Sequence, residues 1–530
     1  MEPTPNISLE KNKRIGFMDF IKKPWFLCLV ITVFILIVYL PTMNTYLMGD
    51  DFEWLDSAYR GWTHPGQLLE LINNFFRPMI KLTYLFNYTL FNTNALFYNI
   101  FTVLLHLLNV VMLFIWIFKI TQKVLIAGSV ALTFGISAMY SEVTLWSAAR
   151  TETVLLIFML TVFILLDKAG EKISISRHIA ILFFGIMAAA SKETWILLPF
   201  LAFAFIWIVK DSSFKTALKN SSGLYVLLIL YAGYFIIGPM LTGKKSPTAY
   251  ASLDILNIIK KFGYMMYRYT GFGDSFTGAV WQFVVLFIVL AGVLWWIIYR
   301  KNRLAGYGFT WLMIMVGISL PIYYAPSRYN YFPLIGFWIM IVALTADGVP
   351  LILEKYKIKK TIAIGTIILV LALYITQQVI MIQVEIKDYR IRGELHKTVV
   401  NLYNRVKNQI PKDKPLVFMD FGTYRAVDVT VASMRGYPKL LFVRQKAIWQ
   451  QVFLSPLANF AGEPFKRLME PIPTKEIDNY LQNDFAILVF TDLGFFIPTS
   501  PTYREKLLKY YRTYRQLPNK VELLRFIPAG

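Results

Sequence analysis

The chain has 530 residues, of which 56% are hydrophobic and only 16% are charged. That length would make about three or four soluble domains, but soluble domains carry about 25% charged residues, so a set of ordinary soluble domains is excluded. The 54 Lys and Arg residues outnumber the 32 Asp and Glu residues by 22. Most of these cationic residues lie in short gaps between apolar runs, which indicates a membrane topology signal and not a nucleic-acid partner.

The first apolar run, Trp25 to Leu40, follows a basic arm, residues 1–24, and contains the only cysteine, Cys28. One cysteine excludes an intrachain disulfide and a cysteine-based metal site. No small-residue cleavage motif follows the run, so we interpret it as a retained signal anchor. Ten further apolar segments bring the total to about eleven spans, or fewer if the fifth and sixth form one kinked helix and a re-entrant piece. They are Phe97 to Phe118, Leu125 to Tyr140, Thr153 to Leu166, Ile179 to Ala190, Ile196 to Val209, Leu224 to Leu241, Trp281 to Ile298, Tyr307 to Tyr324, Tyr331 to Leu344 and Thr361 to Met381.

The gaps between these segments predict the orientation of the chain. Alternate gaps, beginning with the N-terminal arm, are about three times as dense in Lys and Arg as the others, so we expect a cytoplasmic N-terminus and an external C-terminus. This topology predicts a transmembrane catalytic domain over 25–382, with external loops 41–96 and 242–280, and an extracytoplasmic domain over 383–530. The expected location is the plasma (inner) membrane, with the site on the periplasmic or extracellular side.

From about Gln383 the composition changes, because charges and prolines are spread throughout the rest of the chain. Leu395 to Ile410 is predicted as an amphipathic helix, and three apolar runs are typical of strands. These runs are Leu416 to Met419, Leu440 to Val443 and Phe485 to Phe490. We interpret the basic stretch Tyr503 to Arg515 as a solvated helix face in preference to a lipid-headgroup contact. The predicted fold class is therefore mainly α, a polytopic transmembrane helical bundle with a C-terminal α/β domain.

An acidic pair, Asp50 and Asp51, comes directly after the first span. Adjacent carboxylates repel each other, so either one is held protonated or both share a cation. Both arrangements suit a site that activates an acceptor, through a general base or through a divalent cation such as Mg²⁺ or Mn²⁺ bound by Asp50 and Asp51. The alternative is a loop that simply begins with polar residues.

Further ionisable residues gather at the expected outer ends of later spans. They are Glu142, Arg150 and Glu152 after the third span, Lys192 and Glu193 after the fifth, and Arg328 with Tyr329 and Tyr331 between the ninth and tenth. Guanidinium and ammonium groups complement phosphate oxygens, so Arg150, Lys192 and Arg328 predict a phosphate site at the membrane surface. Each one alone is as typical of an interfacial snorkelling residue, but their convergence on one side favours a site.

The two long loops and the second span carry the remaining candidates. Leu68 to Leu90, which includes Arg77, is predicted to form interfacial helices on the outer leaflet. His106 lies within the second span, where a lone histidine is more typical of packing than of catalysis. Arg268 lies in an aromatic part of the second loop that is either a flap over the site or an inert surface helix.

In combination, these residues resemble the GT-C superfamily of integral membrane glycosyltransferases. The resemblance rests on Asp50-Asp51 after one span, Phe76-Arg77-Pro78, His106, the Glu142 to Glu152 segment and Ser191-Lys192-Glu193, and it covers roughly Trp25 to Leu344. It is greatest to bacterial relatives of the dolichyl-phosphate-mannose protein mannosyltransferases and to the aminoarabinose transferase of lipid A. It implies a helical bundle with amphipathic helices in the first external loop, a polyprenyl-phosphate sugar donor and a catalytic first-loop aspartate.

The resemblance also implies a role for each candidate. Either Asp50 or Asp51, with Asp50 preferred, is the general base, and the other positions the acceptor or a metal. The donor phosphate is assigned to Arg150, Lys192, Arg328, Tyr329 and Tyr331; acceptor orientation to Glu142, Glu152, His106 and Arg77; and secondary roles to Glu193 and Arg268. For Glu142 and Glu152 the alternative is that they orient the cations.

The expected function is that of an inverting glycosyltransferase that moves a sugar from a polyprenyl-phosphate donor to an acceptor hydroxyl. The acceptor is a protein, a lipid or a cell-envelope glycan at the outer face of the membrane, and the tail is expected to select it. A lipid-linked polysaccharide ligase or polymerase would share the same site. A polytopic transporter is the third alternative, but it would carry its charges near the midplane in broken helices of two similar halves.

Overall fold

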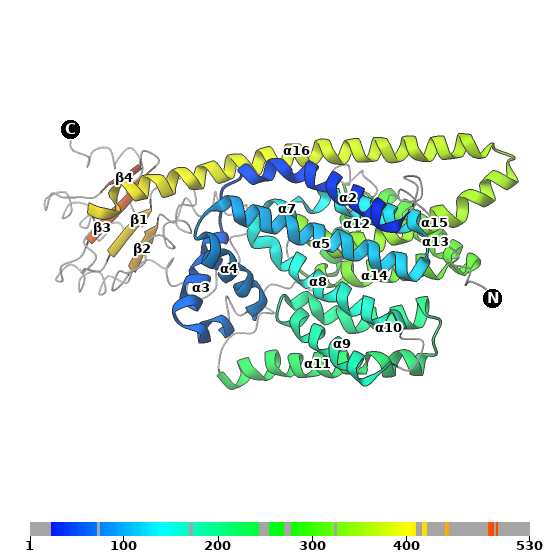
Figure 1. The fold of residues 1–530 in the computed structure, drawn as a ribbon, viewed down its shortest axis with the longest axis horizontal. Helices are drawn as coiled ribbons and strands as arrows, with labels where there is room; N and C mark the ends of the chain where they lie inside the picture. The colour runs from blue at the N-terminus through cyan, green and yellow to red at the C-terminus, as the bar shows by residue number, and fades with distance from the viewer. Residues whose placement is uncertain are drawn as a thin grey trace, which may run out of the picture.

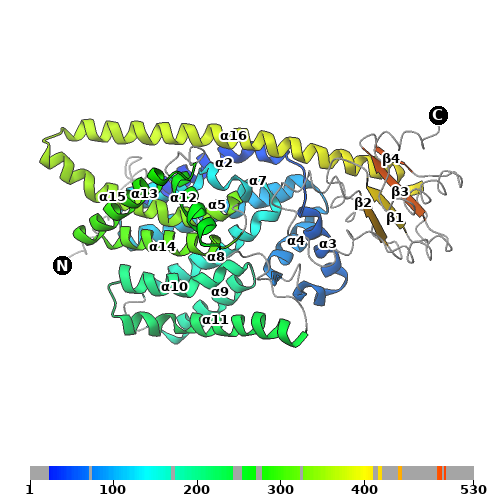
Figure 2. The same ribbon diagram turned by 180° about the vertical axis from the view of Figure 1, so that it is seen from behind.

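The computed structural model describes residues 23–70, 75–168, 173–242, 254–269, 277–322, 326–409, 416–420, 440–444, 486–491 and 494–496. These residues form a long helical bundle with a small sheet at one end (Figure 1). Helices α9 to α11 lie on one side of the bundle and α16 lies along the opposite side, as the view from behind also shows (Figure 2). The connection between α15 and α16 is at the end of the bundle opposite the sheet.

The bundle begins with α2 (Pro24–Tyr39), which continues into the short helix η1 (Leu40–Asn44). The first expected loop then forms three helices, α3 (Asp51–Thr63), η2 (Pro65–Leu69) and α4 (Pro78–Phe91), and α3 packs against α4. Lys81 holds this group together, because its buried ammonium donates to the carbonyls of Gln67 and Glu70, both at 2.7 Å. The helices expected in this loop are therefore present, while residues 71–74 lie outside the described part.

The other helices follow in chain order. They are α5 (Ala95–Thr121), α6 (Val124–Gly135), η3 (Ala138–Tyr140), α7 (Ser141–Leu145), η4 (Ser147–Ala149), α8 (Arg150–Leu165), η5 (Leu166–Lys168), α9 (Ile175–Ala189), η6 (Glu193–Leu197), α10 (Leu198–Ala204), the π-helical turn η7 (Phe205–Val209), α11 (Phe214–Thr242), α12 (Ile255–Tyr269), α13 (Val280–Arg300), α14 (Arg303–Ser319), η10 (Ser327–Asn330), α15 (Tyr331–Lys355), α16 (Lys360–Val406) and η11 (Lys407–Gln409).

Six helices of the described part are long and apolar enough to cross a membrane, or seven if the bent pair 124–135 and 138–145 is one span. Two shorter apolar helices, Ile175–Ala189 and Glu193–Val209, occupy the expected fifth and sixth segments. Many side chains of α13 and α16 are large, apolar and exposed, as lipid-facing side chains are. The chain is a multi-pass membrane protein, and the count of about eleven spans stays a prediction.

Aromatic residues fill the centre of the bundle. The indole of Trp116 on α5 contacts Phe163 of α8, Phe205 of η7, and Tyr307 and Trp311 of α14, with ring centroids 5.0 to 6.1 Å apart. Tilted and edge-to-face contacts of this kind add to the free energy of burial. This cluster fixes the helices below the polar end of the bundle.

The C-terminal sheet has four strands, β1 (Leu416–Asp420), β2 (Leu440–Arg444), β3 (Ala486–Thr491) and β4 (Gly494–Phe496), in the order β2-β1-β3-β4. Strand β1 is parallel to both β2 and β3, and β3 is antiparallel to β4. The three runs predicted as strands are therefore strands. The stretch Tyr503 to Arg515 lies outside the described residues.

Helix α16 differs from the expectation, because it is one continuous helix of 47 residues. From the sequence we expect two elements here, a last span from Thr361 to Met381 and a separate helix from Leu395. The intervening residues stay helical because Ile382, Ile386 and Tyr389 are buried against the bundle, so the loss of apolar character marks a change of surroundings and not a break. The proposed domain boundary at 382/383 thus falls inside a helix.

A tight backbone contact between α14 and α15 gives a test of this packing. A methyl group on Gly336 would lie 2.6 Å from the Gly308 carbonyl oxygen, so Gly336→Ala should push the helices apart and cost roughly 1–3 kcal/mol. Thermal unfolding of the purified protein in detergent measures the loss. Gly348→Ala on the same helix is the matched control, since its added methyl meets no described atom within 4 Å, and an equal loss in both variants would contradict the packing.

Candidate functional site

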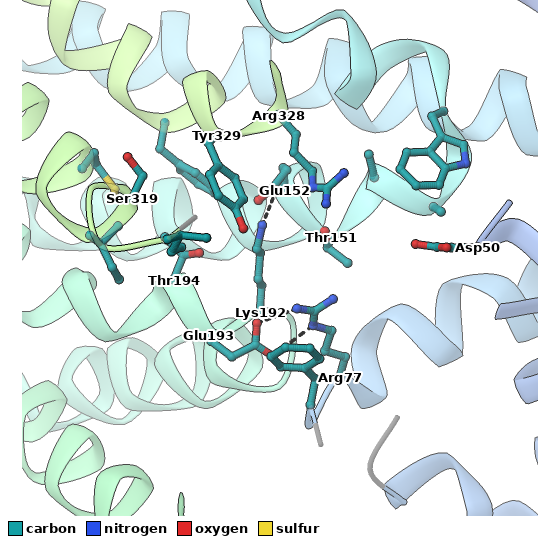
Figure 3. A pocket seen from close by; sticks show the side chains of 18 of the residues that line it. Asp50, Arg77, Thr151, Glu152, Lys192, Glu193, Thr194, Ser319, Arg328 and Tyr329 are labelled. Carbon is teal, nitrogen blue, oxygen red and sulfur yellow. Dashed lines mark hydrogen bonds and ion pairs between the residues drawn. The ribbon is translucent and has the colours of Figure 1, made fainter. Parts of the chain in front are cut away.

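A cavity of about 310 Å³ lies at the end of the bundle that carries α3 and α4 (Figure 3). One part of its wall is apolar and comes from the last turns of α14, the start of α15 and η6. The rest is polar and charged, and comes from α3, the segment before α4, the start of α8, the turn before η6 with the first residues of η6, and η10. The apolar wall contains Ile196, Met315, Ile318, Ile322, Phe332 and Pro333, and the charged side chains are Asp50, Glu53, Arg77, Glu152, Lys192, Glu193 and Arg328.

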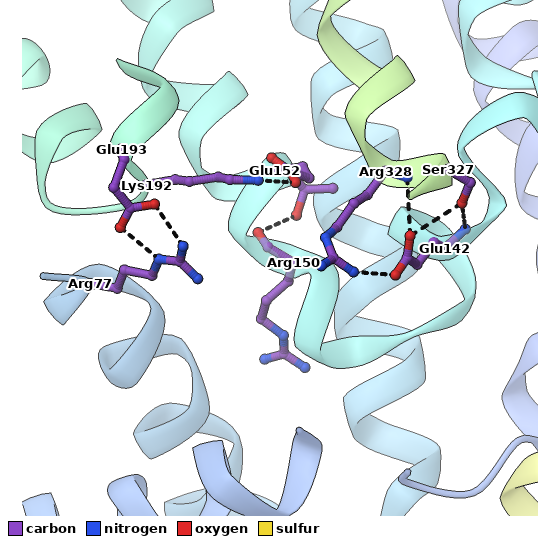
Figure 4. Close-up of polar contacts among 9 residues, drawn as sticks. Arg77, Glu142, Arg150, Glu152, Lys192, Glu193, Ser327 and Arg328 are labelled. Carbon is purple, nitrogen blue, oxygen red and sulfur yellow. Dashed lines mark hydrogen bonds and ion pairs between the residues drawn. The ribbon is translucent and has the colours of Figure 1, made fainter. Parts of the chain in front are cut away.

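Three ion pairs hold the cationic side chains of the cavity (Figure 4). Arg77 makes a two-pronged contact with Glu193, with Nε–Oε1 at 3.0 Å and Nη2–Oε2 at 2.6 Å. Lys192 pairs with Glu152, and Arg328 pairs with Glu142. The structure therefore brings together the expected charged residues of four separate segments.

Arg328 is held at the wall by Glu142, whose carboxylate also accepts from the Arg328 backbone N–H at 3.1 Å and from the Ser327 hydroxyl at 3.3 Å. Glu142 is buried in the short helix α7 and is not part of the cavity wall. Of the two roles expected of Glu142, orienting acceptor hydroxyls or orienting the cations, this geometry supports the second, since its oxygens hold Arg328.

Lys192 lies deepest among the cations of the cavity, with 9% of its side chain exposed, and Glu152 is 1% exposed. Burial lowers the pKa of Lys192 below its ordinary value, against the opposing attraction of Glu152. The ring of Tyr329 lies 5.3 Å from the Lys192 Nζ, a distance typical of a cation–π contact. Figure 3 shows Lys192, Tyr329 and Thr194 around the same space.

The structure places the two adjacent aspartates in different surroundings. Asp50 directly precedes the first residue of α3 and lines the cavity. Asp51 is 1% exposed, and its carboxylate accepts from the Met48 N–H at 2.9 Å and from the Tyr84 hydroxyl at 2.7 Å. Burial raises the pKa of Asp51 from 3.8 to about 6, although both hydrogen bonds oppose this rise. Of the two candidates for a general base, Asp50 is the one that reaches the cavity.

The expectation of a metal ion shared by Asp50 and Asp51 does not fit this geometry. Each oxygen of Asp51 already accepts a hydrogen bond within the protein. Over the described ranges, no group of three His, Cys, Asp or Glu side chains is placed to hold a metal ion. The oxygens of Asp51 are therefore already used within the protein, and a divalent cation bound with the help of Asp50 stays a prediction.

Arg150 does not reach the cavity, contrary to its expected role on the donor phosphate. Its fully buried guanidinium donates to Asn87 Oδ1 at 2.7 Å and to the Ser147 carbonyl at 3.1 Å, and it lies 4.2 Å from the centre of the Tyr84 ring. Figure 4 shows it pointing away from Lys192 and Arg328. Because α8 begins at Arg150 itself, the side chain faces α4 and α5, and it joins these helices to α8.

His106 and Tyr331 are also buried outside the cavity. His106 Nδ1 lies 3.0 Å from the Tyr331 hydroxyl, and Nε2 lies 3.0 Å from the Gly135 carbonyl oxygen. The carbonyl can only accept, so Nε2 carries the proton and Nδ1 accepts from Tyr331. His106 is therefore a packing residue of the bundle, as a lone histidine in a span usually is. Arg268 lies on α12 and is not part of the cavity wall.

Several wall residues were not among the predicted ones. Glu53 and Trp54 lie one turn after Asp50 on α3, and Ile318 and Ser319 lie one turn after Met315 on α14. Both groups have the i, i+3 and i+4 spacing of one helix face. This spacing could have predicted them as wall residues if the first residue of each helix had been known. Trp146, Thr151 and Thr194 come from turns, where no period applies.

These features define a multi-pass membrane protein with a charged cavity at one end of its helical bundle, beneath the short helices of the first loop. The fold is similar to that of ArnT from Cupriavidus metallidurans in the apo state, with a TM-score of 0.54 and 12% identity over 91% of this chain and 94% of that chain. It is also similar to ArnT from the same organism bound to undecaprenyl phosphate, with a TM-score of 0.51, 12% identity and the same coverage. The expected polytopic helical fold is thereby confirmed, in the arrangement that ArnT has. No protein-family model and no curated protein matches the sequence.

The buried Asp51 predicts a pH-dependent stability. Its pKa in the folded protein, about 6, lies above its ordinary value of 3.8, so the folded protein binds this proton more tightly than the unfolded chain does. The resulting stability is present below about pH 4 and is lost as the pH rises through about 6, and the loss is on the order of 3 kcal/mol. To measure this loss, the free energies of unfolding of wild type and Asp51→Asn are determined at several pH values. The change with pH in the difference between the two free energies gives the loss.

Asp50→Asn is the control for this experiment, because it changes the neighbouring carboxylate and keeps the buried one. Its stability should follow the pH dependence of the wild type. A stability difference between wild type and Asp51→Asn that stays constant from pH 4 to pH 7 would contradict the raised pKa.

Proposed function

We propose that the protein is a GT-C type glycosyltransferase that moves a sugar from a polyprenyl-phosphate donor to an acceptor hydroxyl, with inversion at the anomeric carbon. The observation that carries the proposal is a single cavity with Asp50 on one wall and three cations, Arg77, Lys192 and Arg328, on the others (Figure 3). The similarity to ArnT, which has been seen bound to undecaprenyl phosphate, supports the donor class.

The reaction needs a group that accepts a proton and a group that stabilises a leaving phosphate. Asp50 removes the proton from the acceptor hydroxyl as its oxygen attacks the anomeric carbon. The bond between that carbon and the phosphate oxygen breaks, and the electron pair remains on the polyprenyl phosphate, which gains one negative charge. Lys192 and the two guanidinium groups are placed to stabilise this charge as it develops.

The glutamates leave donors on these cations for a phosphate. Among the described residues, Arg77 donates to Glu193 through Nε and Nη2, so its Nη1 stays available, and Lys192 uses one of its three N–H bonds on Glu152. The paired glutamates hold the cations in place and reduce the net positive charge of the empty cavity. Because hydrogen bonds between charged groups are strong and directional, the remaining N–H groups suit a phosphate of fixed orientation.

The apolar wall supports a lipid-linked donor over a soluble one. Met315 and Ile318 on α14, together with Ile322 just after this helix, give the cavity an apolar wall beside its charged one. A prenyl chain gains free energy from burial against such a wall, at about 25 cal/mol per Å². A soluble nucleotide sugar has no prenyl chain that could be buried against this surface.

The outer face of the plasma (inner) membrane is the proposed location of the reaction. The cavity is lined by α3 and the segment before α4, and Figure 1 shows these helices at the end of the bundle opposite the α15–α16 connection. That connection carries Lys355, Lys357, Lys359 and Lys360. Since Lys and Arg concentrate on the cytoplasmic side of membrane proteins, this end is assigned to the cytoplasm and the cavity to the outside. The sheet at the cavity's end belongs, in this proposal, to an extracytoplasmic C-terminal domain that selects a protein, lipid or glycan acceptor.

Asp50→Asn should reduce sugar transfer roughly 10²- to 10⁴-fold, the usual contribution of a general base, while leaving the fold intact because size is preserved. The assay follows labelled sugar from a panel of synthetic polyprenyl-phosphate donors to acceptor with the purified protein. Full transfer by Asp50→Asn would remove Asp50 as the base. Wild type that passes on only preassembled glycans would be a ligase or polymerase, and solute movement in vesicles without transfer would establish a transporter.

Lys192→Met should weaken binding of the donor phosphate about 10- to 100-fold, because it removes a charged hydrogen-bond donor from the cavity. Binding of undecaprenyl phosphate to the detergent-purified protein, measured by its thermal stabilisation, tests this. The single variant leaves Glu152 buried and unpaired, which is itself destabilising. The double variant Lys192→Met/Glu152→Gln is therefore the control for stability, and wild-type affinity in it would show that Lys192 does not bind the phosphate.

A further inference from the structure

The backbone of α16 touches the chain just before Asp50. A methyl group on Gly393 would lie 2.7 Å from the backbone nitrogen of Tyr46 and 3.0 Å from its carbonyl oxygen. No side chain larger than hydrogen fits between two backbones at such distances without movement of one of them. Gly393 therefore lets the helix approach the segment that leads into the aspartate turn, which we define as residues 48–50.

One turn further along α16, His396 contacts the aspartate turn directly. The Gly49 N–H donates to His396 Nε2 at 3.4 Å, at the long end of the hydrogen-bonding range, and the imidazole is stacked on Phe52 with ring centroids 6.2 Å apart and planes at 17°. His396 Nδ1 lies 2.9 Å from the Arg392 carbonyl oxygen, so Nδ1 carries the proton and Nε2 is left to accept. The residues that His396 contacts thus lie on both sides of Asp50 in the chain.

The aspartate turn is held from the opposite side by the bundle. The Trp146 indole N–H donates to the Met48 carbonyl at 3.0 Å, and the Asp51 carboxylate accepts from the Met48 N–H at 2.9 Å. Gly49 has a φ of +54°, which glycine adopts without strain, so the turn is sharp. The position of Asp50 therefore depends on two supports, the bundle and α16.

Helix α16 is itself fixed to the bundle along its length. Gln378 Oε1 accepts from the Ala138 N–H, and the Gln383 side chain donates to the Val38 carbonyl, both at 2.9 Å. The end of α16 beyond His396 leads to the C-terminal sheet, and β4 contacts α16 (Figure 1). Any shift of this end of α16 is passed to Gly49 and Phe52 through His396.

We propose that Gly393 and His396 are positioning residues for Asp50, through which α16 fixes the carboxylate in the cavity. This inference rests on the proposed function of Asp50 as the base. A misplacement of about 1 Å in a reacting group can reduce a rate about 100-fold without weakening the binding of substrate. The loss is therefore expected in kcat and not in the KM for the donor.

Gly393→Ala should lower kcat for sugar transfer about tenfold or more, with the donor KM within about twofold of wild type. Gly365→Ala is the matched control on the same helix, since its methyl would meet no described atom within 4 Å, and it should leave kcat unchanged. His396→Ala should also lower kcat, and His396→Gln should recover part of the loss because its amide oxygen can accept from Gly49. Equal kcat in Gly393→Ala and Gly365→Ala, or no difference between His396→Ala and His396→Gln, would overturn the proposal.

A second measurement tests the same contact without turnover. In a Cys28→Ala background, Asp50→Cys places one thiol in the aspartate turn, and the rate of its reaction with a small water-soluble thiol reagent depends on its exposure and surroundings. Adding Gly393→Ala should change this rate about threefold or more, whereas adding Gly365→Ala should not. If the wild-type protein transfers no sugar, the proposed function is contradicted. The labelling result would still decide whether α16 fixes the aspartate turn. Unchanged labelling with Gly393→Ala would overturn the inference alone.

Discussion

The ion pair between Lys192 and Glu152 is the contact on which the cavity depends. Both side chains are at most 9% exposed at the polar end of an apolar bundle, where an unpaired charge costs several kcal/mol. The pair joins the first turn of α8 to the turn that follows α9, and the adjacent Glu193 reaches Arg77 in front of α4. Because each cation has its own carboxylate, the segments around the cavity can be fixed in place before any substrate enters.

The segments that carry charge were predictable from the sequence, because ionisable residues are so costly in an apolar chain that their clusters mark one end of the bundle. What the sequence could not supply was the direction of each side chain. Asp50 and Asp51 are neighbours, yet only the start of α3 decides which one faces the cavity. Arg150 is turned toward Asn87 by the phase of α8, which depends on the short helix η4 that precedes it. Those directions result from tertiary packing and have no signature in spacing.

The same reasoning explains the outcome for the C-terminal part. The strands were predictable because short apolar runs between polar stretches usually form strands. The register between the strands could not be predicted. The sequence predicts two separate elements in place of α16 because the apolar character of the chain falls after Met381. In the structure that fall reflects a helix with one buried stripe, formed by Ile382, Ile386 and Tyr389 at helical spacing. Periodicity was the better guide there than average hydropathy.

The unbroken length of α16 has a geometric consequence for its C-terminal end. A helix of 47 residues is about 70 Å long, roughly twice the hydrocarbon thickness of about 30 Å, so a large part of it must project beyond the bilayer. The length of α16 therefore sets both the distance of its C-terminal end from the lipid and the rotation of that end about the helix axis. One residue inserted into α16 after His396 would move the end of this helix by about 1.5 Å and rotate it by about 100° about the helix axis. The number of residues between His396 and Val406 therefore determines the position and the direction of the C-terminal end of α16.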